Sequence, residues 1–284
     1  MNLTDEALSL YPNAEIVLWP ETSVTPSVMY QYYYGTDERR VNLINNLLNF
    51  MNNRDCSFVI GNYHKSEEKD YNAALYFTPK KNVNPPGPEM YVKQHLVPLS
   101  ETFPFENSFL SVKNLLSYLG ASFWTSGKED KIFVYKNEIS DEKCLSFSTP
   151  ICFEDTFPDG CRKMVQKGSR CFMNLTNDSW GKSLSCQNQH LAMAVFRSLE
   201  NHIPSVRSAS SGMTCFINEY GEIGKYAPPF SESFVFDEIP VLNQDMPLSF
   251  YTKKGDVFSF VILIFSITLL LIDCIKGILF LWQK

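Results

Sequence analysis

Three short segments each place a reactive side chain directly after an apolar run. Glu21 comes two residues after AEIVLW, Lys93 ends MYVK, and Cys152 follows LSFSTPI. A glutamate can act as a general base, and a lysine cation can lower the pKa of a nearby thiol, which makes the cysteine a better nucleophile. Singly, each residue has a more ordinary interpretation, as a solvated glutamate, a surface lysine or a core cysteine. Their combination is consistent with covalent catalysis by cysteine.

The apolar pattern along the chain predicts the elements that would position these residues. Apolar residues recur at helical spacing over 39–51, 159–167 and 186–200. Short apolar runs predict strands at 14–19, 57–61, 73–77, 90–93, 131–135, 145–151, 170–175, 203–207 and 213–218. The first of these strands is expected to end before Pro20. Strands mixed with helices in this order predict an α/β fold, and such folds place their sites at strand ends.

The C-terminal segment 257–282 has the composition of a membrane helix. From Val257 to Ile272 it reads VFSFVILIFSITLLLI, without a charge. A helix over the whole segment is roughly 39 Å long, enough to cross a hydrocarbon core of about 30 Å. Asp273 and Lys276 lie three residues apart near one end, where they can pair. We therefore expect a single transmembrane helix, with a buried core helix as the alternative.

Charge and composition exclude several classes of function. The net charge of −6 and the lack of an Arg/Lys-rich face argue against a nucleic-acid partner. The eight cysteines include no C-x-x-C pair, and the four histidines form no metal-ligand spacing with them. A chain of this size can bury a core without a disulfide framework. We expect no metal and no cofactor, and we expect the cysteines other than Cys152 to be small core residues.

The three reactive residues, in this order, resemble the Glu–Lys–Cys triad of the nitrilase superfamily. The chain is similar to one branch of it, the bacterial apolipoprotein N-acyltransferases. The motifs that carry this resemblance are WPET at 19–22, GNY at 61–63, NAAL at 72–75, YVKQHLVP at 91–98, ICFED at 151–155, NLTNDSWG at 174–181, QHLAMAVFRSLEN at 189–201 and VRSASSG at 206–212. An apolar segment after the catalytic domain also belongs to this branch, and soluble amidases lack it.

The resemblance implies a nitrilase-like four-layer α-β-β-α sandwich followed by a single transmembrane helix. The catalytic domain would span 1–241, a linker 242–256 and the membrane helix 257–282. Family members carry a multi-helix membrane bundle and one further strand before the stretch that leads to WPE. We expect both to be missing from this chain, so a separately encoded N-terminal membrane portion is an expected partner.

The resemblance also implies the chemistry. Cys152 would attack the sn-1 ester of a phospholipid to form a thioester, with Glu21 as general base. Lys93 and the backbone N–H of Phe153, which follows the nucleophile, would stabilise the oxyanion. Glu101 and Glu154 would support Lys93 or line the site.

The implied acceptor is the α-amino group of diacylglyceryl-cysteine in an apolipoprotein. The implied location is the bacterial inner membrane, with the catalytic domain on the periplasmic side. Apolar residues at 103–105 are expected to contact acyl chains or, equally, to be ordinary buried loop residues. Two alternatives to the acyltransferase stay open: an amidase that uses the same triad, and a catalytically inactive, tail-anchored remnant.

Overall fold

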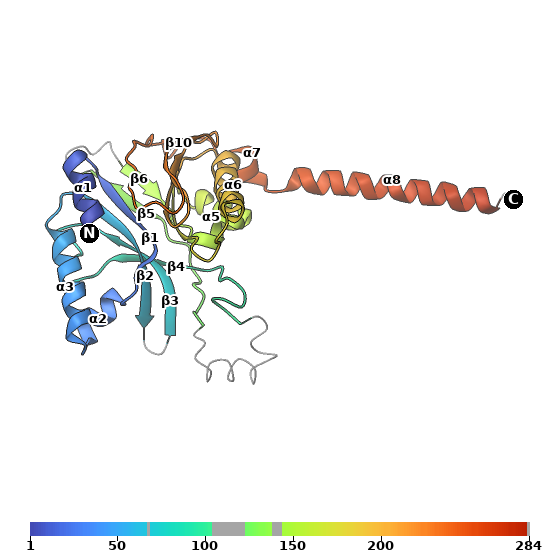
Figure 1. The fold of residues 1–284 in the computed structure, drawn as a ribbon. Coiled ribbons are helices and arrows are strands. Elements are labelled where there is room, and N and C mark those ends of the chain that lie inside the picture. The colour runs from blue at the N-terminus through green and yellow to red at the C-terminus, as the bar shows by residue number, and fades with distance from the viewer. Residues whose placement is uncertain (67–68, 104–122, 138–143, 283–284) are drawn as a thin grey trace.

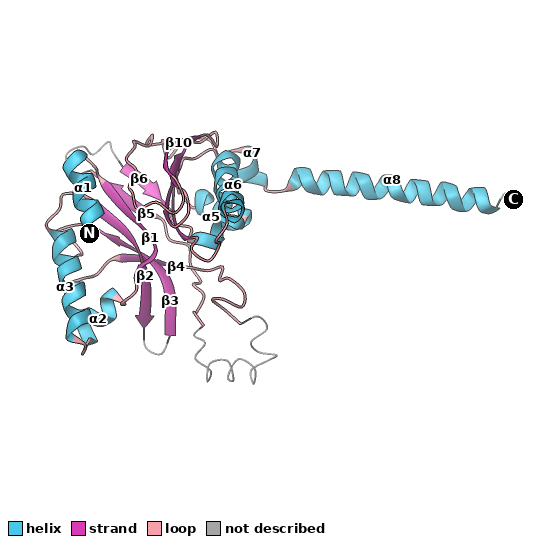
Figure 2. Ribbon diagram, in the orientation of Figure 1, coloured by secondary structure: helices cyan, strands magenta, loops and turns pink. Residues whose placement is uncertain are grey.

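Two β-sheets lie face to face at the centre of the molecule, and helices cover the outer face of each (Figure 1, Figure 2). The structure is a computed structural model that describes residues 1–66, 69–103, 123–137 and 144–282. Its four layers are the α-β-β-α arrangement that the sequence predicted.

The N-terminal half forms the first sheet and its helices. The strand order is β1-β2-β3-β4, with β1 parallel to β2 and the other neighbours antiparallel. The strands are β1 (Ile16–Val24), β2 (Ser57–Ser66), β3 (Lys69–Phe77) and β4 (Glu89–Val92). The helices on its outer face are α1 (Asn2–Leu10), α2 (Val28–Tyr34) and α3 (Glu38–Asn52). Ile44, Leu47, Leu48 and Met51 recur along one side of α3, which is why that side packs on the sheet.

The second sheet has the order β10-β9-β8-β7, with β7 and β8 parallel. Its strands are β7 (Phe172–Asn177), β8 (Ser205–Ser210), β9 (Thr214–Ile217) and β10 (Ile223–Ala227). The helices on this side are α5 (Pro158–Gln166) and α6 (Leu184–Asn201). β5 (Phe133–Lys136) and β6 (Cys144–Phe147) form a separate antiparallel pair. The residues that follow β6 form parallel bridges with β7 and so connect this pair to the second sheet.

The main core lies between the two sheets and is rich in aromatic rings. Phe133 stacks on Phe147 with 5.3 Å between ring centroids, and Tyr76 meets Phe147 edge-on at 5.4 Å. Phe172 and Leu175 of β7 complete this cluster with side chains from β2 and β3. Because both faces of β2 are covered, its residues from Ser57 to Asn62 are all buried.

One sequence expectation about the first strand is wrong. β1 does not end before Pro20 but continues to Val24, with a register shift against β2 between Trp19 and Val24. Proline is tolerated there because, within the residues that the structure describes, β1 is an edge strand, where a missing N–H costs least.

The C-terminal segment leaves the second helical layer as one long helix (Figure 1). Over Val257–Ile278, α8 (Val257–Trp282) is long and apolar enough to cross a membrane, with a mean hydropathy of 2.6 and none of it buried against the body. The preceding segment, expected to be a simple linker, contains a further helix, α7 (Phe250–Lys254). Gln166 of α5 donates to the Thr252 carbonyl at 2.7 Å, so α7 is fixed to the body.

Candidate active site

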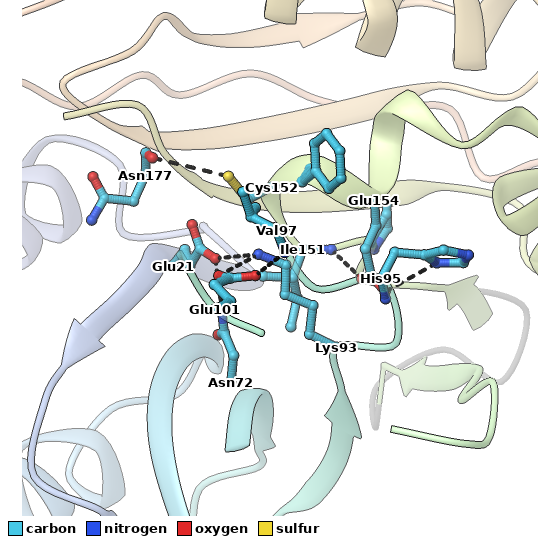
Figure 3. A network of polar contacts seen from close by, with 12 residues as sticks. Glu21, Asn72, Lys93, His95, Val97, Glu101, Ile151, Cys152, Glu154 and Asn177 are labelled. Carbon is cyan, nitrogen blue, oxygen red and sulfur yellow. Dashed lines mark hydrogen bonds and ion pairs between the residues drawn. The ribbon is translucent and has the colours of Figure 1, made fainter. Parts of the chain in front are cut away.

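Lys93 is fully buried between two carboxylates at the end of β4 (Figure 3). Its Nζ lies 3.0 Å from Glu21 Oε1 and 2.8 Å from Glu101 Oε1. Burial alone would lower the pKa of the lysine, but Glu21, Glu101 and the neighbouring thiol outweigh it and hold that pKa above its ordinary value. Lys93 is therefore a permanent cation.

The two carboxylates are held in place by neighbouring polar groups. Asn72 of β3 donates to Glu21 Oε1 at 2.6 Å, and the backbone N–H of Val97 donates to Glu101 Oε2 at 2.8 Å. Glu21 itself lies in the irregular part of β1 between Trp19 and Val24, where the next residue, Thr22, has φ of 48°. The predicted roles of Glu21, Lys93 and Glu101 thus fall on residues that the fold brings together.

Cys152 lies at the start of the short 3-10 helix η1 (Cys152–Thr156), directly after Ile151, which forms a bridge with Leu175 of β7. Its φ of 49° is in the left-handed region, which is strained for a residue with a side chain. Its Sγ lies 3.9 Å from the Asn177 carbonyl. Burial, together with the Glu21 carboxylate, raises the pKa of the Cys152 thiol to about 12, and Lys93 offsets only part of that rise. The resting nucleophile is therefore a thiol, which needs a base.

Glu154 has a different place from the one expected. It neither contacts Lys93 nor lines the cavity at Cys152. Its Oε1 accepts hydrogen bonds from the Tyr91 hydroxyl at 2.8 Å and from the Gln94 N–H at 2.7 Å, and its Oε2 accepts from the Ile151 N–H at 2.8 Å. Glu154 therefore ties the chain beside Lys93 to the residue before the nucleophile.

A cavity of about 600 Å³ opens beside Cys152. Phe153, whose backbone N–H is the expected oxyanion donor, directly follows Cys152, and its side chain lines the cavity. Its ring meets the Phe157 ring edge-on, with 5.0 Å between the centroids. The cavity is lined by Glu21, Thr22, Val97, Ser100, Glu101, Trp124, Cys152, Phe153, Thr156, Asn177, Ser179, Trp180, Cys186, Gln189, His190 and Met193.

The loop at 103–105, expected to contact acyl chains, is described only in part. Phe103 is partly buried, and its ring lies 6.1 Å from that of Phe123. Residues 104 and 105 lie outside the described residues.

A second buried charge network lies on the other side of Cys152, and sequence reasoning missed it. His190 of α6 lies between two carboxylates: its Nδ1 is 2.7 Å from Asp178 Oδ1 and its Nε2 is 3.0 Å from Asp155 Oδ1. Arg207 of β8 reaches the same pair, 2.7 Å from Asp155 Oδ2 and 3.2 Å from Asp178 Oδ2. His190 Nε2 also lies 3.3 Å from the Cys152 carbonyl oxygen.

These contacts decide the charge of His190. Burial would lower its pKa, but Asp155 and Asp178 together raise the pKa of His190 to about 9. The Cys152 sulfur, an Asp178 oxygen and a His190 ring nitrogen lie within 4.8 Å of one another, a grouping that could in principle hold a metal. A protonated imidazole has no lone pair to offer, however, so these donors suit a cation–carboxylate network better than a metal site.

Two glycines in the motifs allow close approach at this site. A Cβ on Gly61 would lie 2.3 Å from the Pro20 oxygen and 2.6 Å from Glu21 Cα. A Cβ on Gly212 would lie 2.2 Å from Asp178 Oδ2. Each glycine thus leaves the room that a carboxylate of one of the two networks needs.

Comparison with known proteins identifies relatives of this chain. The chain is 38% identical to apolipoprotein N-acyltransferase 1 of Treponema denticola, over 96% of this chain and 52% of that protein. The Treponema pallidum apolipoprotein N-acyltransferase 1 is 40% identical over 85% of this chain and 44% of its own length. The Borreliella burgdorferi apolipoprotein N-acyltransferase is 30% identical over 95% of this chain and 50% of its own length. The chain spans about half the length of the curated relatives it matches.

Solved structures agree in fold. The yeast (Saccharomyces cerevisiae) protein Nit3, of the nitrilase superfamily, superposes with a TM-score of 0.54 at 15% identity, over 80% of this chain and 78% of that one. An amidase from Nesterenkonia sp. superposes with a TM-score of 0.54 at 15% identity, over 80% of this chain and 79% of the amidase chain. The model of the carbon-nitrogen hydrolase family matches residues 1–243, which include both sheets and every site residue described above. The chain therefore belongs to the carbon-nitrogen hydrolase family.

Proposed function

We propose that this chain carries the catalytic part of an apolipoprotein N-acyltransferase, which moves an acyl chain from a phospholipid to a lipoprotein amine through a thioester on Cys152. The observation that carries this proposal is a buried Glu21–Lys93–Cys152 group opening onto a cavity with apolar walls, in a chain that ends in a membrane-length helix. The names of its relatives support the same substrate class.

In the first half-reaction, Glu21 takes the proton of the Cys152 thiol as its sulfur bonds to the ester carbonyl carbon. The coupling is needed because the thiol is neutral at rest, with a pKa of about 12. The tetrahedral intermediate carries an oxyanion. When it collapses, the ester C–O bond breaks and Glu21 returns the proton to the departing lysophospholipid oxygen.

In the second half-reaction, the α-amino nitrogen of diacylglyceryl-cysteine attacks the thioester carbonyl. The C–N bond forms, the C–S bond breaks, and a proton passes from the amine through Glu21 to the Cys152 sulfur. The product is an amide-linked acyl chain, and the enzyme returns to its thiol form.

Lys93 and Phe153 supply the oxyanion donors in this scheme. An ammonium has three N–H donors, and among the described residues the Glu21 and Glu101 carboxylates use two of them. The third, with the Phe153 backbone N–H, is available to the oxyanion, where one donor contributes about 3 kcal/mol.

The test is mass spectrometry of the purified chain in detergent with a phospholipid. We expect the mass of one acyl group on Cys152, released by hydroxylamine as a thioester would be. Cys152→Ser should lose this thioester. Cys186→Ser is the matched control, because Cys186 lines the same cavity, and it should keep the adduct.

The other outcomes separate the alternatives. Turnover of a water-soluble amide without any phospholipid adduct would identify an amidase. An adduct that forms only after the remaining half of a relative is supplied as a second polypeptide would show that a separate membrane portion is required. No adduct under any condition would leave an inactive, tail-anchored remnant.

We also propose that α8 crosses the bacterial inner membrane and holds the catalytic body on the periplasmic side, where lipoprotein amines would be exposed. Protease added to spheroplasts should then digest the body. Digestion only after lysis would place the body in the cytoplasm.

A further inference from the structure

The exposed side of α6 carries no charged residue. Its exposed side chains are Leu184, Ser185, Asn188, Gln189, Ala192, Met193, Phe196 and Leu199. Of the charged residues near its end, Arg197 is buried, and Glu200, whose side chain is 23% exposed, pairs with it at 2.8 Å. The exposed side of α5, in the same layer, has Asp159 and Lys163 instead. A surface helix without exposed charges is unusual in water.

The position of α8 shows what lies next to this face. Ser249, just before α7, donates to the Glu200 carbonyl at 2.6 Å, and Thr252 of α7 donates to Asn201 Oδ1 at 2.9 Å. Both acceptors belong to the last turn of α6. α8 begins three residues after α7 and projects from this layer, away from the two sheets (Figure 1). The membrane that α8 enters must therefore begin close to the C-terminal end of α6.

The side chains around this junction suit a lipid interface. Phe250 is exposed beside the basic pair Lys253 and Lys254, which can meet anionic headgroups. Trp180 is 68% exposed at the other end of the face, and tryptophan prefers the membrane interface. Trp180 and Met193 also line the cavity beside Cys152, so the α6 face is continuous with the cavity mouth.

We infer that the uncharged face of α6 lies in the interface of the same bilayer that α8 enters and delivers phospholipid acyl chains to the catalytic cavity. The inference rests on the proposed function for the identity of the substrate. A second copy of the chain is the less favoured occupant, because the contacts of Ser249 and Thr252 with the last turn of α6 fix the start of α8, and so the bilayer, near that end of the face.

Photo-crosslinking of the full chain tests the inference. Benzoylphenylalanine would be placed at position 196 or 199, and the protein reconstituted in bilayers of phosphatidylethanolamine and phosphatidylglycerol. Leu43 of α3 is a matched control, because it is 46% exposed on the opposite layer and Leu199 is 43% exposed. We expect the mass of one phospholipid to be added at 196 and 199 several-fold more often than at 43. A crosslinked dimer, or equal lipid yield at all three positions, would overturn the inference.

A kinetic test separates lipid access from chemistry. Phe196→Asp should slow acylation of Cys152 by bilayer phospholipid several-fold, yet leave acylation by a short-chain, water-soluble p-nitrophenyl ester unchanged. Phe196 is exposed and does not line the cavity, so the variant should fold. Slower acylation by both donors, or by neither, would contradict the inference. Lipid crosslinks at 196 and 199 without acylation by any donor would instead refute the proposed function alone.

Discussion

The charge of His190 makes a quantitative prediction about stability. Its pKa is about 9 in the folded chain, whereas an unfolded histidine titrates near 6.5. A group whose pKa is raised by folding stabilises the fold fully below the unfolded pKa, and this contribution disappears as pH rises through the folded pKa. The full contribution is about 3 kcal/mol at 1.4 kcal/mol per pKa unit, and about 2 kcal/mol of it is lost between roughly pH 7 and pH 9.

The perturbation is His190→Gln, which removes the charge but keeps an amide donor for one carboxylate. Asp155, Asp178 and Arg207 face the ring from η1, from the end of β7 and from β8, and the Cys152 carbonyl completes its surroundings. With the histidine gone, Arg207 alone balances two buried carboxylates. We expect the variant to be about 2–3 kcal/mol less stable than the wild type near pH 7 and equally stable near pH 9 to 10.

Urea unfolding of the full chain in mild detergent, followed by near-ultraviolet circular dichroism across this pH range, measures the difference. His64→Gln is the matched control. His64 is also buried, but burial lowers its pKa, so its contribution is lost only as pH falls below about 6.5. Between pH 7 and 9, the free energy of unfolding of the control should fall with pH as steeply as that of the wild type. If His190→Gln keeps that slope as well, His190 is neutral in the folded chain and the reasoning fails.

Three further predictions concern the Cys152 site. Lys93→Met leaves the carboxylates of Glu21 and Glu101 buried without their cation, so it should abolish the acyl adduct seen by mass spectrometry and cost about 3–5 kcal/mol in urea unfolding; wild-type stability would show that Lys93 is solvated. Gly61→Ala forces the backbone at Glu21 to move, so it should slow adduct formation and cost about 1–3 kcal/mol, and an unchanged rate would show that the turn can shift freely. Treatment with EDTA should leave the acylation rate of Cys152 unchanged, and a loss restored by added zinc would overturn the expectation of no metal.

The sequence predicted most of the regular structure in this fold where local periodicity is strong. The helix expected at 186–200 is α6 (Leu184–Asn201), and the one at 39–51 is α3 (Glu38–Asn52), because their apolar residues recur at helical spacing. α2 was not predicted, since its sequence VMYQYYY consists largely of aromatic and β-branched residues that favour strands. Its helical form depends on tertiary contacts, among them the burial of Val28 against the first sheet.

The two halves of the site differed in how far they could be predicted. Glu21, Lys93 and Cys152 each follow an apolar run, but they were selected because the three occur together in the order of the Glu–Lys–Cys triad that the chain's motifs resemble. Asp155, Asp178, His190 and Arg207 lie inside the recognised motifs, yet no spacing between them reveals that they meet. They belong to four segments that only the packing of α6 on the second sheet brings together.

Hydrogen bonds to Glu154 and to His190 hold the backbone on the two sides of the strained Cys152 φ. The peptide N–H before Cys152, that of Ile151, donates to Glu154, and the carbonyl of Cys152 itself faces His190 Nε2. The positive φ lies between these two fixed points, so the backbone cannot relax without breaking a buried charge-assisted hydrogen bond. We therefore expect Glu154 and His190 to act as positioning residues, because each holds the backbone that carries the Cys152 sulfur.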